Sequence, residues 1–200
     1  MHIRENNRGG AGVVVAAVLG GLLLIVLLAG GWLVGKYNTI QKMTVAVDQS
    51  WGQVQNVLQR RADLIPNLVS TVKGYSIHEK DVLANISAAR AALGGAKTPT
   101  EAMKANGELS GALSRLLVVV ENYPNLKADT QFTRLMDELA GAENRIAVER
   151  KRYNDSIGVY NSYIVTFPNS LVAGFAGAQK KPFFEAEAGA KEVPKVDFGK

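Results

Sequence analysis

Residues 11–35 read AGVVVAAVLGGLLLIVLLAGGWLVG, a run with no charged residue and almost no polar atom. As a helix the run would reach about 37 Å, which exceeds the roughly 30 Å hydrocarbon core of a bilayer. It is also about twice as long as the apolar core of a cleaved signal peptide, and the chain lacks the cysteine of a lipoprotein cleavage site. We therefore interpret the run as an uncleaved transmembrane anchor rather than as a signal peptide.

The charges on either side of the run bear on its orientation. Arg4 and Arg8 precede it, and Lys36 and Lys42 follow it closely, so the count of basic residues is balanced. The free amine at the N-terminus adds to the arginines. This favours a cytoplasmic N-terminus, with the rest of the chain on the extracytoplasmic side.

The remaining residues are enough for a single domain with a real core. We predict a short polar N-terminal tail (1–10), the transmembrane helix (11–35), a helical bundle (36–168), and a tail (169–200) with a short apolar patch and a disordered end. The net charge of +5 is modest, and basic residues alternate with acidic ones, so nucleic acid is not an expected partner.

Apolar residues after the anchor recur at intervals of three and four, which predicts one face of a long first helix. This face comprises Ile40, Met43, Val47, Trp51, Val54, Leu58, Ile65, Leu68 and Val72. Pro66 lies inside the pattern and is expected to kink or break the helix.

The starts of the next two helices carry capping signals. Ser76 with Glu79 is typical of a capping box, which predicts a second helix to about Leu93. Thr98 with Pro99 predicts the start of a third helix, which should end near Tyr123.

The fourth predicted helix begins near Asp129 or Thr130 and ends at Pro168. Its pattern has a period of about 3.5 residues, which is typical of long helices packed side by side. The positions are Phe132, Leu135, Leu139, Ala142, Ile146, Glu149, Tyr153, Ile157, Tyr160, Ile164 and Phe167. The sequence therefore predicts an all-α protein, in which an N-terminal transmembrane helix precedes an antiparallel bundle of about four helices.

Residues for catalysis are scarce. His2 and His78 are the only histidines, Val82 stands where a zinc-protease motif needs its second histidine, and no Gly-rich phosphate loop with a lysine is present. The paired Glu-x-x-His motifs of a di-iron bundle are also missing. We expect no cofactor, no metal and no enzymatic activity.

A patterned polar surface, which we call the polar stripe, lies opposite the apolar face of the first helix. It is either a solvated outer face or a docking surface for another copy or a different protein. Its members are Gln53, Asn56, Arg60, Asp63 and Asn67, with Gln49 one step before them.

A second polar set lies beside the apolar seam and should face a neighbouring helix. We expect Arg61 to pair with Glu143 or Glu149, because a buried charge must be compensated. The set is interpreted either as a polar network that sets the helix register or as a catalytic site. It comprises Arg61, Glu143, Glu149, Arg150, Asn154 and Asn161.

Small residues recur four apart within the anchor, a pattern that allows close helix approach in lipid. They are Gly12, Ala16 and Gly20, followed by Gly31 and Gly35.

Several separated motifs resemble the LemA family in the family's order. They are Tyr37-Asn38, RRADLIPNLVSTVKGYSIHE (60–79), ENYPNLKA (121–128), Glu143 to Ile146, Tyr153-Asn154, Tyr160-Asn161 and Phe167-Pro168. The resemblance implies a bacterial protein with one membrane span and a long helical bundle, and it supplies no catalytic residue. One departure is Phe183, where the family commonly has tyrosine before Phe184 and Glu185.

Two functions fit these features. The first is a scaffold at the bacterial cytoplasmic membrane that self-associates through the span and the long helices into a homo-oligomer. The second is an adaptor that holds a separate membrane enzyme, such as a peptidase, through the polar stripe and the apolar patch of the tail.

Overall fold

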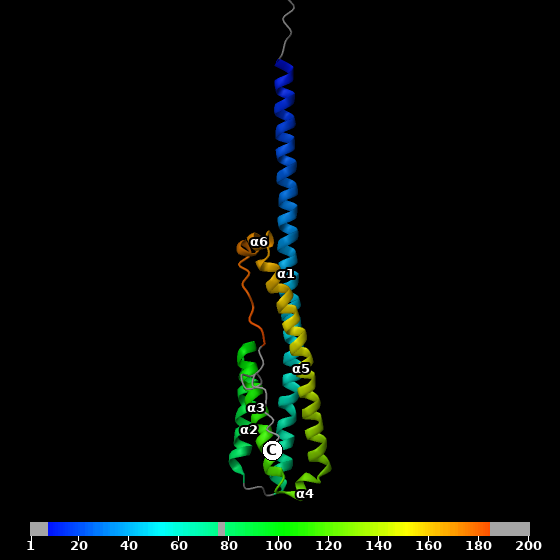
Figure 1. The fold of residues 1–200 in the computed structure, drawn as a ribbon, viewed down its shortest axis with the longest axis vertical. Coiled ribbons are helices and arrows are strands. Elements are labelled where there is room, and N and C mark those ends of the chain that lie inside the picture. The colour runs from blue at the N-terminus through cyan, green and yellow to red at the C-terminus, as the bar shows by residue number, and fades with distance from the viewer. Residues whose placement is uncertain (1–7, 76–78, 185–200) are drawn as a thin grey trace, which may run out of the picture. The chain divides into compact units, whose positions relative to one another are not determined.

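The computed structural model describes residues 8–75 and 79–184, and over these ranges it contains helices and turns but no strand. The elements are α1 (Arg8–Gly74), α2 (Lys80–Gly95), α3 (Pro99–Val120), α4 (Pro124–Lys127), α5 (Thr130–Val165) and α6 (Asn169–Phe175) (Figure 1). The all-α class with a long apolar N-terminal helix is confirmed. The predicted disordered end and the first seven residues of the predicted N-terminal tail lie outside the described residues.

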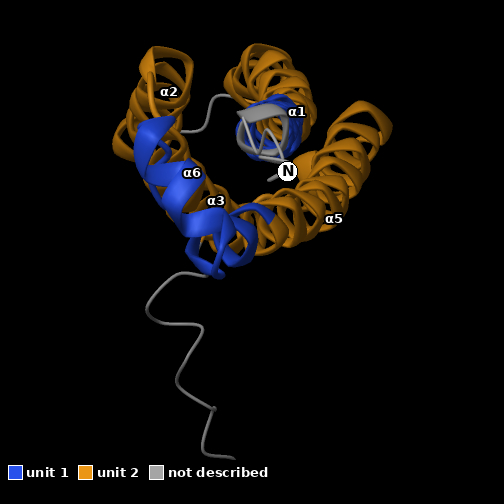
Figure 2. Ribbon diagram, turned by 90° about the horizontal axis from the view of Figure 1, so that it is seen from above, with its two compact units in different colours: residues 1–45, 160–180 blue, residues 46–159, 181–200 orange. Residues whose placement is uncertain are grey.

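The chain divides into two compact units, which Figure 2 distinguishes by colour. We call residues 1–45 and 160–180 the anchor unit, and residues 46–159 and 181–200 the bundle unit. Helices α1 and α5 each contribute to both units. The segment 181–184, which the sequence places in a tail, belongs to the bundle unit.

Within the bundle unit, α1 and α5 run antiparallel and side by side. The rings of Trp51 and Tyr153 lie 5.3 Å apart, and the Tyr75 hydroxyl lies 2.6 Å from an Asp129 carboxylate oxygen. From the first pair to the second, the residue number rises by 24 on α1 (51 to 75) and falls by 24 along α5 (153 to 129). The two helices therefore stay in one register over this length.

Helices α2 and α3 form a hairpin that packs on α1. They lie side by side in Figures 1 and 2, and a short turn at residues 96–98 joins them. The Arg90 side chain on α2 donates a hydrogen bond from Nε to the backbone oxygen of Ala62 on α1, at 3.0 Å. This contact joins the hairpin to the C-terminal part of the long helix.

The apolar faces that the sequence predicts for the long helices are the buried faces of the structure. The fully buried side chains include Val54, Leu68, Leu109, Leu116 and Ile157. Each such side chain contributes about 1.5–3 kcal/mol by leaving water. Met43, Trp51, Met103 and Glu149 are only partly covered, and Phe167 is 75% exposed.

The structure decides between the two outcomes expected at Pro66 and adds two short helices. Helix α1 continues through Pro66 to Gly74, so of the expected kink or break the break is excluded. Glu79 precedes α2 and makes no capping hydrogen bond through its side chain. Ser76, the other member of the predicted capping box, lies outside the described residues. The short helices α4 and α6 were not predicted, because each is too short to show a periodic pattern.

The starts of α3 and α5 are capped as their sequences indicate. The Thr98 hydroxyl accepts a hydrogen bond from the Glu101 backbone N–H, at 3.2 Å. Before α5, an Asp129 carboxylate oxygen accepts the Phe132 N–H at 2.7 Å, while the other oxygen accepts the Tyr75 hydroxyl. The Tyr75 hydrogen bond, followed by the Phe132 amide, lowers the pKa of Asp129, and the same bond to Asp129 raises the pKa of Tyr75.

We expect Asp129→Asn to flatten the acid dependence of stability. A lowered carboxyl pKa contributes stability above the unfolded value of about 3.9, and this contribution is lost as the pH falls through the folded value. Asparagine retains a capping oxygen but does not titrate. Acid unfolding followed by circular dichroism should therefore be steeper below about pH 4 for the natural protein than for the variant. Tyr75→Phe should also reduce the pH dependence of stability, because it removes the hydrogen bond from the tyrosine hydroxyl to Asp129. Parallel acid-unfolding curves for the natural protein and both variants would contradict the lowered pKa of Asp129.

In the anchor unit, the apolar run is uncovered by the rest of the chain. An 18-residue window of α1 reaches a mean hydropathy of 2.9, and every residue from 12 to 35 is exposed. Directly after the run, the Lys36 ammonium lies 5.7 Å from the centroid of the Trp32 ring and 5.6 Å from that of the Tyr163 ring. This helix is long and apolar enough to cross a membrane.

Candidate interaction site

The polar stripe lies on the surface of α1 within the bundle unit. Gln53, Asn56, Arg60, Asp63 and Asn67 are all exposed, and Asp63 accepts a hydrogen bond from Gln59 at 2.7 Å. At its end, Asn67 borders an open groove between α1 and α5. The other residues of this groove are Leu64, Thr130, Gln131, Arg134, Leu135 and Glu138.

Beneath this surface, Arg61 joins three helices through a buried guanidinium. The residue is 4% exposed, and its Nη1 lies 2.6 Å from Oε2 of Glu143 on α5. On α3, Asn106 Oδ1 accepts from Nη1 at 2.5 Å, and Ser110 Oγ accepts from Nη1 and Nη2 at 3.1 Å. Of the two partners expected for Arg61, the structure brings Glu143 to it. We call Arg61, Asn106, Ser110 and Glu143 the arginine cluster.

The electrostatics of the arginine cluster favour a structural role. Burial lowers the pKa of Arg61, and the nearby Glu143 carboxylate opposes this effect. The Glu143 contact has the distance of an ion pair but not the angles of a hydrogen bond, and Arg61 Nε is buried without a hydrogen-bond partner. The contacts of this one side chain link α1 to α3 and to α5.

The other members of the predicted network do not join Arg61. Glu149 forms an ion pair with Arg152 on the same helix, at 2.7 Å. Asn161 is half-buried and belongs to the anchor unit. Sequence reasoning expected Arg150 and Asn154 to face a neighbouring helix, and in the structure both contact Phe184 in the segment 181–184.

Asn154 holds the backbone of Phe184 by two hydrogen bonds. Its Nδ2 donates to the Phe184 carbonyl at 2.8 Å, and its Oδ1 accepts the Phe184 N–H at 2.7 Å. The Phe184 ring is buried, 6.4 Å from the Trp51 ring and 5.8 Å from the Arg150 guanidinium. We call this set the Phe184 clamp.

A charge pair fixes the beginning of the same segment. Lys181 Nζ lies 2.8 Å from Oδ1 of Asp48 on α1. Burial, followed by repulsion from Asp48, raises the pKa of Tyr153, which stacks against Trp51. The C-terminal segment is therefore attached to both α1 and α5 within the bundle unit.

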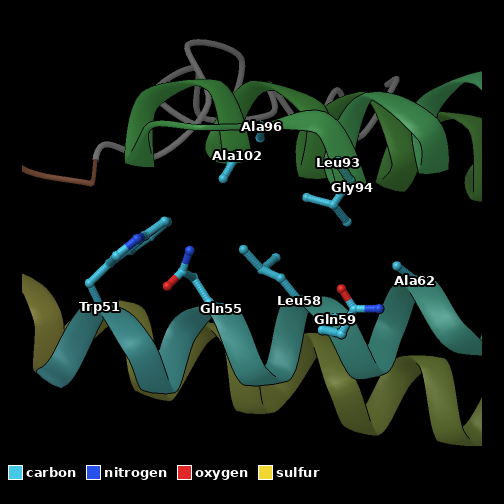
Figure 3. A pocket seen from close by; sticks show the side chains of 9 residues that line it. All are labelled: Trp51, Gln55, Leu58, Gln59, Ala62, Leu93, Gly94, Ala96 and Ala102. Atoms are coloured by element: carbon cyan, nitrogen blue, oxygen red, sulfur yellow. The ribbon is translucent and has the colours of Figure 1, made fainter. Parts of the chain in front are cut away.

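A hollow of about 120 Å³ lies between α1 and the turn that joins α2 to α3 (Figure 3). Trp51, Gln55, Leu58 and Gln59 line it from α1, opposite Leu93 and Ala102. Its volume is below the ~300–1,000 Å³ of ordinary small-molecule sites. Within the described ranges, 8–75 and 79–184, no group of three or more His, Asp or Glu residues is placed to hold a metal ion.

The small residues of the span stand on an open helix surface. Gly12, Ala16, Gly20, Gly31 and Gly35 are exposed, and a Cβ added to any of these glycines would meet no atom within 4 Å. No described residue, over 8–75 and 79–184, packs on these glycines.

Two parts of the site were missed by sequence reasoning. Asn106 stands within the buried face of α3 between Ala102 and Leu109, and a polar residue in an apolar pattern is a usable signal for a buried network. The Phe184 clamp joins residues 30 apart or more in sequence, and no local pattern indicates such a contact.

The described chain is an all-α protein that combines a helix suited to crossing a membrane with a helical bundle joined by a buried arginine. The sequence profile of the LemA family matches residues 50–198, and the chain belongs to this family.

Relatives with assigned names support this membership. The magnetosome proteins MamQ 1 and MamQ 2 of Paramagnetospirillum magneticum are each 26% identical over 191 residues, which cover 81% of this chain and 69% of the relative. Protein LemA of Metamycoplasma hominis is 24% identical over 168 residues, which cover 82% of this chain and 74% of the relative. None of these names states an enzymatic reaction.

Proposed function

We propose that this protein is a non-enzymatic scaffold, anchored by α1 in the bacterial cytoplasmic membrane and assembled from several copies. The observation that carries the proposal is the uncovered apolar surface of α1, where every residue from 12 to 35 is exposed. Such a surface requires lipid or another apolar surface to cover it. We place the bundle on the extracytoplasmic side.

The residues at the end of the apolar run 11–35 support anchoring of the protein in a membrane. Lysine beside tryptophan and tyrosine rings is the composition typical of a membrane–water interface, where the ammonium reaches water and the rings remain at headgroup level. Trp32 near the end of the apolar run, Lys36 directly after it and Tyr163 of α5 provide this set.

Two open faces of α1 support self-association. In the span, small residues four apart let two helices approach closely. In the bundle unit, the polar stripe is exposed and is not part of the arginine cluster. Both faces are exposed among the described residues and are available for contacts between copies.

We expect Ala16→Leu to reduce the assembly size of the full-length protein in detergent, because leucine separates helices that approach at a small residue. Ala29→Leu is the matched control. Ala29 is exposed like Ala16, and it lies about 220° away around the helix at ~100° per residue. Light scattering after size-exclusion chromatography measures the mass.

An equal mass for Ala16→Leu, Ala29→Leu and the natural protein would remove the span face from the proposal. A natural protein that is already a single chain would remove self-assembly as a whole. The role left would then be that of an adaptor for a membrane enzyme, with the polar stripe and its adjoining groove as the docking surface.

A further inference from the structure

Helix α6 and the turn that precedes it present large apolar side chains to solvent. Phe167, Leu171 and Phe175 follow one another at intervals of four residues and are 75%, 57% and 91% exposed. Val172 and Ala173, on the other side of α6, are buried. Because residues four apart share a helix face, Leu171 and Phe175 form one surface, which we call the α6 strip together with Phe167.

The anchor unit brings the beginning of this segment to the end of the apolar run. Tyr163, on the last turn of α5, lies with its ring 5.6 Å from the Lys36 ammonium. Phe167 follows Tyr163 by four residues, and α6 begins at Asn169. The α6 strip therefore starts close in sequence to an aromatic and lysine set that is typical of the membrane surface.

We propose that α6 binds the surface of the bilayer that α1 crosses, with the α6 strip inserted among the headgroups and the first acyl carbons. This inference rests on the membrane anchoring proposed above. Amphipathic helices that lie in the interface carry Phe and Leu on their buried face, as this strip does.

A lipid surface fits the strip better than a second copy does. Three side chains offer much less than the roughly 800 Å² per partner of a stable protein interface. A membrane surface requires no complementary partner groove, and the lipid already meets α1 within the same unit. The lipid therefore matches both the size and the location of the strip.

The chain has no cysteine, so single cysteines can report the depth of chosen positions. We suggest Phe175→Cys and Leu171→Cys for the strip, Leu24→Cys for the middle of the run, and Val118→Cys on α3 as an exposed control from the bundle unit. All four side chains are exposed, so the substitutions leave the core intact. Each full-length variant carries the fluorophore NBD in phosphatidylcholine vesicles that contain lipid with a nitroxide either on the headgroup or deep on the acyl chain.

The expected result is a blue-shifted emission at positions 175 and 171 relative to position 118. Emission at both strip positions should lose intensity with headgroup nitroxide, whereas position 24 should lose it with deep nitroxide and position 118 with neither. Quenching at 24 without quenching at 171 and 175 would overturn the inference and leave the anchoring in place. No quenching at 24 would overturn the anchoring itself, together with the inference.

A second copy gives a different result. If the strip is covered by protein, positions 171 and 175 shift to the blue without quenching by either lipid, and the shift disappears on dilution of the protein in lipid. That outcome would overturn the lipid assignment.

Discussion

Replacing Glu143 by alanine is expected to lower the free energy of unfolding by about 2 kcal/mol, because Arg61 would keep its charge in a buried site without its ion pair. Removing one partner of a fully buried pair costs about 3–5 kcal/mol. We place the cost lower because the Glu143 side chain is 47% exposed, so water can reach the vacated position. Urea unfolding of the full-length protein in detergent, followed by circular dichroism, measures the change.

A double-mutant cycle isolates the ion pair. Arg61→Met keeps much of the side-chain volume and removes the charge, so it should cost only about 1 kcal/mol. In that background, Glu143→Ala should cost less than about 0.5 kcal/mol. Glu149→Ala is the matched control, since Glu149 pairs with an exposed arginine and should contribute at most about 0.5 kcal/mol. Strictly additive costs for Arg61→Met and Glu143→Ala would show that the pair contributes nothing.

Phe184→Ala is expected to release the C-terminal segment from the bundle unit. The ring is 6% exposed, and burial of a phenylalanine contributes about 1.5–3 kcal/mol. At about 1.4 kcal/mol per factor of ten, amide hydrogen exchange in the peptide that contains residue 184 should become tenfold faster or more. Mass spectrometry of the exchanged full-length protein measures this rate.

The adjoining phenylalanine is the control for this variant. Phe183 is 48% exposed, so Phe183→Ala should change the exchange rate little. Fluorescence gives a second readout, because Trp32→Phe leaves Trp51 as the only tryptophan. In that background, emission should move to the red with Phe184→Ala and stay in place with Phe183→Ala. Equal effects of the two alanines would contradict the Phe184 clamp.

Individual helices of the fold could be predicted where the sequence shows a regular spacing or a capping signal. The apolar run, the buried face of α5 and the start of α3 at Thr98 and Pro99 each follow from spacing or from capping chemistry. Pro66 shows the limit of local reasoning. A proline in a helix loses one hydrogen bond, but α1 continues because Ile65 and Leu68 on either side of it are buried in the core.

The contacts of the candidate site could be predicted from the sequence only in part. The sequence places Arg61, Glu143 and Glu149 near the seam between helices, but the choice of Glu143 depends on the register of α1 against α5. Asn154 was expected to face a helix and instead binds the backbone of Phe184. Helical periodicity indicates which face of a helix is covered, but it does not indicate which segment covers it.

The proposed scaffold requires several copies of this membrane-anchored chain to assemble. Light scattering of the purified full-length protein, corrected for bound detergent, measures the number of copies. We expect a protein mass that is a multiple of the 21.4 kDa chain. A protein mass equal to one chain, for a sample that retains its helical circular dichroism, would rule out the assembly.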